Sequence, residues 1–185
     1  NDNFKTVTFV YTDGYQEVKP LGVTVVLHGN SSSVPYDSVA HTVSDYVVDS
    51  ISSELYSEAD FQLAEGKQAT ATRTDAGTAY MGLTGGDFVN TNGNFSSVAF
   101  VYTDGYQEVK PARVTVTADE AQKEYATDDP TFTATVDGAL NGDSIDYELT
   151  RPGAGTDEAV GSYPNAIVPV GAADQGNYEV EFVPG

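Results

Sequence analysis

The side chains that could carry out chemistry in this 185-residue chain are mainly carboxylates, because cysteine and tryptophan are absent and histidine occurs only twice. Without cysteine the chain has no disulfide, thiolate metal site or thiol nucleophile. His28 and His41 supply too few nitrogen ligands for a closed zinc site. We therefore expect both histidines to lie at the surface or in capping positions, and we predict no metal site.

The 28 acidic residues make calcium better suited to this chain than zinc, since Ca²⁺ prefers hard oxygen ligands. The candidate ligands lie in acid-rich predicted turns: Asp128, Asp129, Asp143, Asp157 and Glu158. No Asp-x-Asp-x-Asp-Gly loop is present. A solvated acidic surface is the favoured interpretation, and no cofactor is predicted.

No pattern in the chain marks a catalytic centre. A Gly-x-Ser-x-Gly nucleophile elbow is absent. Among so many acids, pairs at the spacing of a glycosidase will occur by chance. An intramolecular Lys–Asn isopeptide bond would need a lysine within a strand, whereas Lys19 and Lys110 lie at predicted module junctions. We expect a protein without enzymatic activity.

The 12 tyrosines are the side chains best suited to contact a ligand. Several lie near predicted turns, where they could stack on a glycan or bond to a protein: Tyr15, Tyr36, Tyr46, Tyr80 and Tyr106. For each of them the favoured alternative is a half-buried strand residue that covers a thin core.

The net charge of −20 excludes two classes of partner. Phosphate recognition needs a basic surface, which 8 Lys and Arg against 28 acids do not supply, so we expect no nucleic acid partner. Anionic lipid would repel such a surface. No apolar run approaches the roughly 20 residues of a membrane span, so we also expect no membrane insertion.

An internal repeat organises the chain. Residues 9–20 return as residues 100–111, identical at all 12 positions and 91 positions later. The Val-Thr-Val of residues 23–25 returns at residues 114–116 with the same offset. A repeat of this length and fidelity indicates a duplicated module.

The repeat predicts three parts. Residues 1–20 are the C-terminal strands of a preceding repeat copy, residues 21–111 form a complete module, and residues 112–185 form a module of another type that lacks its final strand. A Lys-Pro pair closes each copy, which suits a short, semi-rigid connection between strands. Modules joined so closely form an elongated rod.

Alternation of apolar and polar residues predicts that strands dominate both modules. The apolar positions are Val23, Val25 and Leu27; Val98, Phe100 and Tyr102; Val114, Val116 and Ala118; Phe132, Ala134 and Val136; Ile145, Tyr147 and Leu149; and Tyr178, Val180 and Phe182. The Asp-Gly pairs at residues 13–14 and 104–105 predict hairpin turns.

Helix is expected only in short pieces. The spacing of a hydroxyl and a carboxylate in Ser57–Phe61 and in Thr84–Phe88 is close to a capping box, which predicts one helical turn with the phenylalanine pointing inward. Asp119–Tyr125 is the other candidate for a short helix. The predicted fold class is mainly β, with small modules in tandem, and an α+β arrangement of β-grasp-like modules is the alternative.

From Val114 onward, five short motifs follow one another in a recognisable order: Val114-Thr115-Val116, Lys123-Glu124-Tyr125 with Asp128-Asp129-Pro130, Asn141-Gly142-Asp143, Gly161-Ser162-Tyr163 and Gly176-Asn177-Tyr178. In these motifs the second module resembles the MBG domain (YGX type) of repetitive bacterial surface proteins. Ala126 stands where that family has glycine. The resemblance implies a β-rich repeat unit.

The first module resembles a companion repeat of large surface proteins in Gram-positive bacteria. The motifs that carry this resemblance are Tyr36-Asp37-Ser38 with His41, Tyr56 with Asp60-Phe61, Ala76–Met81, and Asp104-Gly105-Tyr106. Ser38 replaces the glycine that usually follows Tyr-Asp. The resemblance implies an adhesin-like, cell-wall-anchored, extracellular stalk without enzymatic activity.

The predicted function is therefore that of a tandem-repeat stalk segment, which spaces a distal binding region from the cell wall. The alternative is a carbohydrate- or mucin-binding module that contacts host glycans directly. Neighbouring repeats of the same chain are the expected partners. We also expect open strand edges at residues 1–20 and 177–185 to pair between molecules, or residues 1–20 to fold against the first module.

Overall fold

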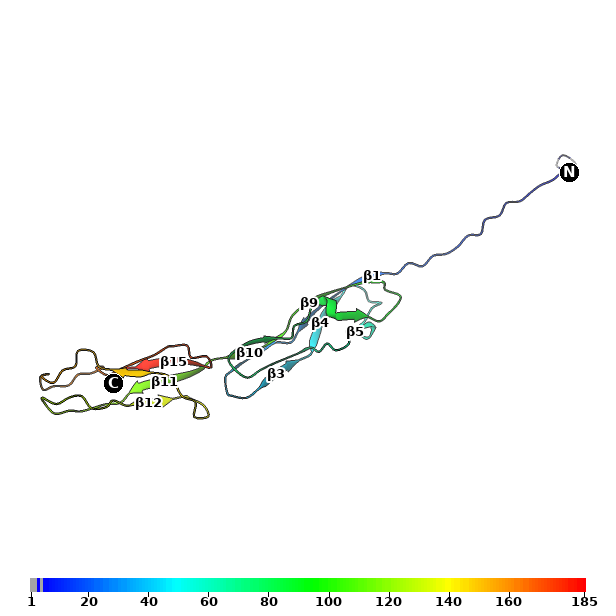
Figure 1. Ribbon diagram of the computed structural model, residues 1–185. Helices are drawn as coiled ribbons and strands as arrows, with labels where there is room; N and C mark the ends of the chain where they lie inside the picture. The colour runs from blue at the N-terminus through cyan, green and yellow to red at the C-terminus, as the bar shows by residue number, and fades with distance from the viewer. Residues whose placement is uncertain (1–2, 4) are drawn as a thin grey trace.

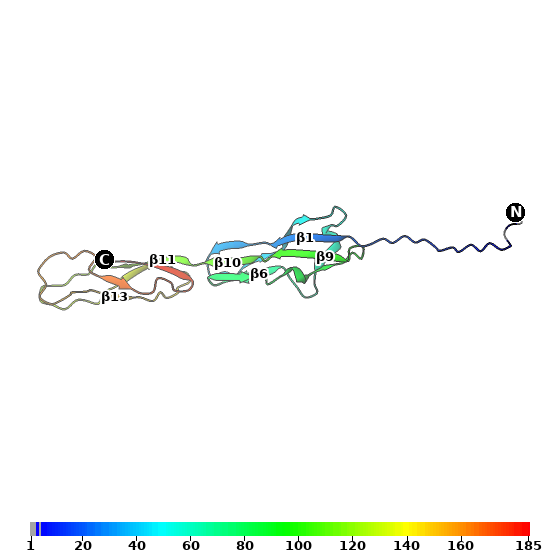
Figure 2. The ribbon, with the colours of Figure 1, turned by 90° about the horizontal axis from the view of Figure 1, so that it is seen from above.

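The computed structural model describes residue 3 and residues 5–185 of the chain. Two β-rich modules lie end to end, and an extended N-terminal segment, residues 5–20, continues along the same line (Figure 1). Viewed from above, the molecule has the same elongated outline (Figure 2). The shape is the rod that the tandem repeat predicts.

The first module, residues 21–111, is built from short strands and two single-turn 3-10 helices. They are β1 (Gly22–Gly29), β2 (Ser32–Pro35), β3 (His41–Ser44), β4 (Tyr46–Ile51), η1 (Glu58–Asp60), β5 (Phe61–Leu63), β6 (Thr70–Arg73), β7 (Gly77–Tyr80), η2 (Gly85–Asp87), β8 (Phe88–Asn90), β9 (Ser97–Thr103) and β10 (Tyr106–Lys110).

Two three-stranded sheets form the length of this module. In the first, β1 lies between antiparallel β4 and parallel β9. In the second, β10 lies between parallel β2 and antiparallel β7. The pairs β3–β6 and β5–β8 complete the module.

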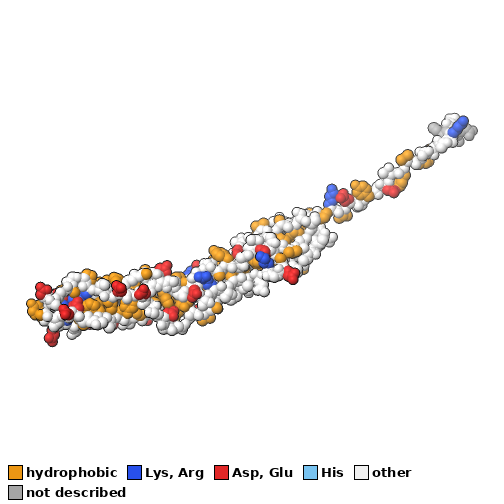
Figure 3. Space-filling model, in the orientation of Figure 1, with side chains coloured by type: hydrophobic (Ala, Val, Ile, Leu, Met, Phe, Trp, Pro, Cys, Tyr) orange, Lys and Arg blue, Asp and Glu red, His pale blue; other side chains and the backbone are white. Residues whose placement is uncertain are grey.

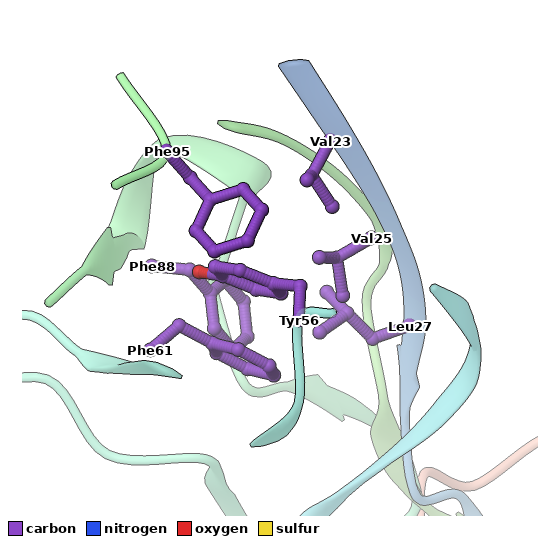
Figure 4. Close-up of a cluster of buried hydrophobic side chains, with 7 residues drawn as sticks. All are labelled: Val23, Val25, Leu27, Tyr56, Phe61, Phe88 and Phe95. Carbon is purple, nitrogen blue, oxygen red and sulfur yellow. The ribbon is translucent and has the colours of Figure 1, made fainter. Parts of the chain in front are cut away.

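The core of the first module lies against one face of β1. Val23, Val25 and Leu27 alternate along that strand and are almost completely buried, as the period-two pattern predicts. Four aromatic rings cover them from loops and short strands (Figure 4): Tyr56, Phe61, Phe88 and Phe95.

The two 3-10 helices confirm the predicted caps. The Asp60 carboxylate accepts hydrogen bonds from both the backbone N–H and the hydroxyl of Ser57. Asp87 accepts the same pair from Thr84. Each helix is followed by a buried phenylalanine, which the cap directs into the core.

The second module, residues 112–185, has fewer strands and longer loops. Its strands are β11 (Ala112–Ala118), β12 (Ala134–Asp137), β13 (Glu148–Thr150), β14 (Val168–Val170) and β15 (Tyr178–Val183). β11 lies between antiparallel β12 and parallel β15, and β13 pairs with β14. Over the described residues the fold is mainly β, with η1 and η2 as the helical elements, so the fold class is as predicted and the α+β alternative is not what forms.

Two local predictions are wrong. Asp119–Tyr125 forms no helix: the segment after β11 has no regular secondary structure, and Lys123 within it is held by Asp129 and Glu158. Asp104-Gly105 makes no hairpin, because β9 and β10 pair with β1 and β2 rather than with each other. Long-range pairing overrides the local turn signal at this position.

The N-terminal segment behaves differently from its identical copy. Residues 5–20 form no strand and are exposed throughout, whereas the copy forms β9 and β10. The expectation that this segment folds against the first module is not met in the single chain. Residues 1, 2 and 4, which also belong to the predicted preceding copy, lie outside the described residues.

Candidate functional site

The first and last strands of the first module run side by side in the same direction. β1 pairs with β9 and β2 pairs with β10, both parallel. The partner of each residue lies 75 positions later throughout, from Gly22 with Ser97 to Pro35 with Lys110 (97 − 22 and 110 − 35). The two pairings therefore form one ladder in a single register. It is interrupted only at residues 30–31 and the facing residues 104–105, which we call the step.

That step depends on two facing glycines. A Cβ atom at Gly29 would lie 2.6 Å from the backbone nitrogen of Gly105, and a Cβ atom at Gly105 would lie 2.6 Å from the carbonyl carbon of Gly29. Asp104 fixes the neighbouring loop, because its carboxylate accepts a hydrogen bond of 2.9 Å from the Gly82 backbone N–H. The close approach of the two backbones lets the ladder continue past the step.

The second module repeats this arrangement. β11, its first strand, pairs in parallel with β15, and each partner lies 66 positions later, from Ala112 with Tyr178 to Thr117 with Val183 (178 − 112 and 183 − 117). Both modules thus join the strand where the chain enters to a strand near its C-terminal end.

The junction between the modules is a packed core. Only Pro111 separates β10 from β11, and one buried cluster draws residues from both sides. Its members are Tyr36 and Val109 from the first module with Val114, Val116, Ile145, Tyr178 and Val180 from the second. The Lys-Pro pair therefore connects two modules that share side-chain packing.

Asn177 holds the junction through hydrogen bonds. Its side-chain oxygen accepts a bond of 2.7 Å from the Ala76 backbone N–H, and its amide nitrogen donates to Asp75 at 3.0 Å. Its backbone carbonyl accepts from Ala112 at 2.9 Å. Sequence reasoning did not single out Asn177 as a junction residue, because its partners lie about a hundred positions away.

Tyr178 fills the centre of the junction. Its ring packs edge to face on Tyr36, with centroids 5.5 Å apart and an interplanar angle of 86°. Its hydroxyl donates a 2.7 Å hydrogen bond to Asp143 and accepts one from the Leu140 backbone N–H. Burial raises the pKa of this phenol, and the hydrogen bond to Asp143 adds to the effect. The candidate calcium ligand Asp143 is therefore part of the junction.

Four charged side chains meet near the far end of the second module. Lys123 lies 2.8 Å from Asp129 and 3.1 Å from Glu158. Arg151 donates two hydrogen bonds of 2.8 Å to Glu158 and one of 2.9 Å to Asp129. The guanidinium also lies over the ring of Tyr163, 5.4 Å from its centroid.

These contacts fix the charge state of the cluster at neutral pH. Hydrogen bonds from Lys123 and then Arg151 lower the pKa of Asp129, and those from Arg151 and then Lys123 lower the pKa of Glu158. The pKa of Lys123 is raised, chiefly by its bond to Asp129. A charged lysine is not a nucleophile, so the cluster is a set of ion pairs.

Three of the acids considered as candidate calcium ligands have other partners. Asp129 and Glu158 both form ion pairs with Arg151. Asp143 accepts a hydrogen bond from the hydroxyl of Tyr178. Over the part of the chain that the structure describes, no group of three or more acidic or histidine side chains is placed to hold a metal ion.

The two histidines also lie apart from each other. His28 contacts Asp49 at 2.9 Å, and His41 contacts Asp37 at 2.8 Å. The bond from His41 is the main cause of the lowered pKa of Asp37. Each histidine thus pairs with one acid at the surface of the first module.

A groove with a volume of about 720 Å³ lies beside the ion pairs in the second module. Its lining includes residues 120–125, residues 158–167, Arg151 and Gly185. Tyr125 and Tyr163 line it and are partly exposed. We refer to this feature as the distal groove.

Tyrosines occupy different environments along the rod. Tyr36 and Tyr46 take part in aromatic contacts within the cores. Tyr80 is exposed and packs edge to face with Tyr106, with centroids 5.9 Å apart. Tyr15 lies in the N-terminal segment and is 91% exposed.

Comparison with known proteins finds a family for the second module. Residues 114–185 match the family model described as MBG domain (YGX type), as their motifs indicate. No curated protein and no solved structure matches the chain. Among the described residues, no helix is long and apolar enough to cross a membrane.

Proposed function

We propose that this chain is a non-catalytic stalk segment of a bacterial surface protein, in which it spaces a distal binding region from the cell wall of a Gram-positive bacterium. The match of residues 114–185 to the MBG domain (YGX type) supports an origin in a repeat protein. The end-to-end modules and the acidic surface, on which carboxylates outnumber cations (Figure 3), suit an extended and solvated rod.

The observation that carries the proposal is the parallel ladder between the strands where force would enter and leave. Tension along the rod pulls β1 at Leu21 and β10 at Lys110 in opposite directions. Because β1–β2 and β9–β10 are parallel and in one register, this tension shears the ladder along its length. The hydrogen bonds then share the load, instead of breaking one after another.

The junction passes this tension directly to the second module. β10 leads through Pro111 into β11, whose partner β15 is again parallel. The shared core and the bonds of Asn177 fasten the two modules to each other. A stalk needs such a connection, because a loose linker would fold back instead of holding its partner at a distance.

Single-molecule pulling tests the proposal. The chain has no cysteine, so two introduced cysteines give unique attachment points. Leu21→Cys with Lys110→Cys applies force along the ladder, whereas Leu21→Cys with Ser97→Cys applies it across the first ladder pair. We expect an unfolding force several times higher in the first geometry, because the hydrogen bonds of the ladder must then break together. This raises the unfolding barrier, which governs forced unfolding.

All three positions are exposed, so both double variants should retain the wild-type melting temperature. Equal unfolding forces in the two geometries would contradict a mechanical role. Under low force, the variant attached at residues 21 and 110 should hold these two points apart at the length of the folded first module.

A second proposed function is direct contact with host glycan or mucin, and the two tyrosines of the distal groove favour it. Tyr125 is 66% exposed and Tyr163 is 46% exposed, so both rings offer a face for stacking. A glycan and mucin array tests it, with Tyr125→Ala as the groove variant and Tyr80→Ala as the matched control. Saturable binding that only Tyr125→Ala removes would support recognition.

A further inference from the structure

A tight turn of the second module carries an Asn-Gly pair at the junction. The Asp143 backbone N–H donates a 2.8 Å hydrogen bond to the Leu140 carbonyl. The two residues between them, Asn141 and Gly142, have positive φ angles of 52° and 76°. Positive φ at both central positions defines a type I′ turn, for which Asn-Gly is a preferred pair.

Both ends of this turn contact the tyrosine at the centre of the junction. The Leu140 backbone N–H donates to the Tyr178 hydroxyl at 3.1 Å, and the Asp143 carboxylate accepts from that hydroxyl at 2.7 Å. The conformation of the turn therefore decides whether the Tyr178 hydroxyl keeps its two partners.

The middle of the turn reaches across to the first module. The side-chain amide of Asn141 donates a hydrogen bond to the hydroxyl oxygen of Ser38. Ser38 gives its own proton to the Asp37 backbone carbonyl, so its oxygen acts as the acceptor. The contact therefore needs an N–H group at residue 141.

The Asn141 side chain can also react with the backbone that follows it. A glycine after asparagine has no Cβ atom to hinder the approach of its nitrogen to the side-chain carbonyl carbon. An atom added at Gly142 would meet nothing within 4 Å, and its N–H donates no hydrogen bond among the described residues. Both residues are exposed, so the turn can open locally at low cost in free energy.

We infer that Asn141 is a site of spontaneous deamidation, which converts it to aspartate or isoaspartate and loosens the junction. The Gly142 nitrogen attacks the side-chain carbonyl carbon of Asn141. The new C–N bond replaces the bond to the amide nitrogen, which leaves as ammonia with the backbone proton. One water molecule then opens the five-membered imide at either of its two carbonyl carbons.

Both products disturb the contacts of the turn. A carboxylate at residue 141 has no proton to donate to Ser38, and it adds one negative charge to a chain whose net charge is already −20. Isoaspartate also lengthens the main chain by one carbon atom, within a turn whose two ends hold the Tyr178 hydroxyl. The junction therefore loosens as the protein ages.

A second Asn-Gly pair, Asn92-Gly93, provides a control within the same chain. The Asn92 side-chain amide donates to Asp60 at 2.8 Å, and its oxygen accepts from the Asn94 backbone N–H at 3.1 Å. The backbone carbonyl of Asn92 accepts two further hydrogen bonds. More bonds must therefore break for attack at Asn92 than for attack at Asn141.

Incubation of the 185-residue chain at mildly alkaline pH and physiological temperature tests the inference, with peptide mass mapping of both sites. In the folded chain we expect residue 141 to convert at least about tenfold faster than residue 92, because of the additional hydrogen bonds that hold Asn92. In concentrated urea, where neither turn is held, the two rates should be similar. Equal rates in the folded chain, or a residue 141 that stays asparagine while the unfolded chain converts, would overturn the inference.

The variant Asn141→Asp mimics one product and tests the effect on the junction. Aspartate tolerates positive φ much as asparagine does, so the variant changes the donor and the charge. We expect the melting temperature to fall by about 4 °C, and small-angle X-ray scattering to show a broader distribution of distances. Incubated wild-type protein should change in the same direction, in proportion to the fraction converted.

Asn165→Asp is the matched control. Asn165 is exposed in the same module, has a positive φ of 58°, and its side chain makes no hydrogen bond among the described residues. This variant should melt and scatter like the wild type. If Asn141→Asp also behaves like the wild type, residue 141 does not hold the junction and the inference is wrong.

Discussion

At the scale of single residues, two positions carry a side chain where the backbone conformation favours glycine. Ser38 and Ala126, where the resembled repeats are expected to have glycine, both have positive φ angles, 63° and 68°. An L-residue pays about 1–2 kcal/mol in this left-handed region. Ser38 and Ala126 therefore hold a strained backbone conformation that glycine would adopt without this cost.

Replacing Ala126 by glycine should therefore stabilise the second module. We expect Ala126→Gly to raise the free energy of unfolding by about 1 kcal/mol, reduced by the extra freedom of glycine in the unfolded chain. Urea denaturation measures the change. Ala121→Gly is the control: Ala121 has no positive φ, so there the same replacement should destabilise slightly. A loss of stability from Ala126→Gly would contradict the assignment of strain.

At the scale of elements, sequence patterns predict which residues form strands better than they predict which strands pair. The alternation at Val23, Val25 and Leu27 marks the buried face of β1, since burial follows from the period of the strand. The Asp-Gly signal at residues 104–105 predicts a hairpin that does not form. The residues that pair between β1 and β9 are 75 positions apart in the chain. A local sequence pattern cannot predict a pairing over that distance.

The charged cluster shows the same limit. Oxygen chemistry alone makes Asp129 and Glu158 candidate calcium ligands, with a solvated acidic surface as the favoured interpretation. Lys123 and Arg151, which neutralise them, lie up to 35 positions away from them in the chain (158 − 123). The composition could have indicated these ion pairs. With 8 basic residues against 28 acidic ones, each Lys or Arg is expected to find an acidic partner.

The step in the ladder gives a sharp prediction for the pairing of β1–β2 with β9–β10. Gly105→Ala should destabilise the first module by about 1–3 kcal/mol, because its Cβ would overlap the backbone at Gly29. Thermal unfolding measures the effect. Gly14→Ala changes the identical copy, where nothing lies within 4 Å of the new atom, and should leave the melting temperature unchanged. Equal effects at the two positions would rule out the close approach.

At the scale of the whole molecule, the junction decides whether the rod is stiff. The shared core joins Tyr36 and Val109 to β11 and β15, and the bonds of Asn177 close one side. The sequence predicts a short connection from Lys110-Pro111 but not this packing, because its members come from five separate stretches of chain. One core therefore spans the junction, beside the separate core of the first module.

Loss of the Asn177 side chain should loosen this connection. We expect Asn177→Ala to cost about 1–2 kcal/mol, since the Ala76 N–H and Asp75 lose their partner. Small-angle X-ray scattering should show a broader distribution of distances as the rod bends. Gln68→Ala changes an exposed amide without a hydrogen-bond partner among the described residues and should scatter like the wild type. An unchanged profile for Asn177→Ala would indicate that the apolar contacts alone hold the modules in line.

The pairing of first with last strands also sets the order of events during synthesis. β1 meets β9 only when the chain has grown 75 residues further, and contacts so far apart in sequence form slowly. The β1–β4 pair can form earlier, but the parallel ladder of a nascent first module stays incomplete until β9 and β10 have emerged from the ribosome. Each module therefore matures as a unit, and the ladder that joins its entering strand to its last strands forms last.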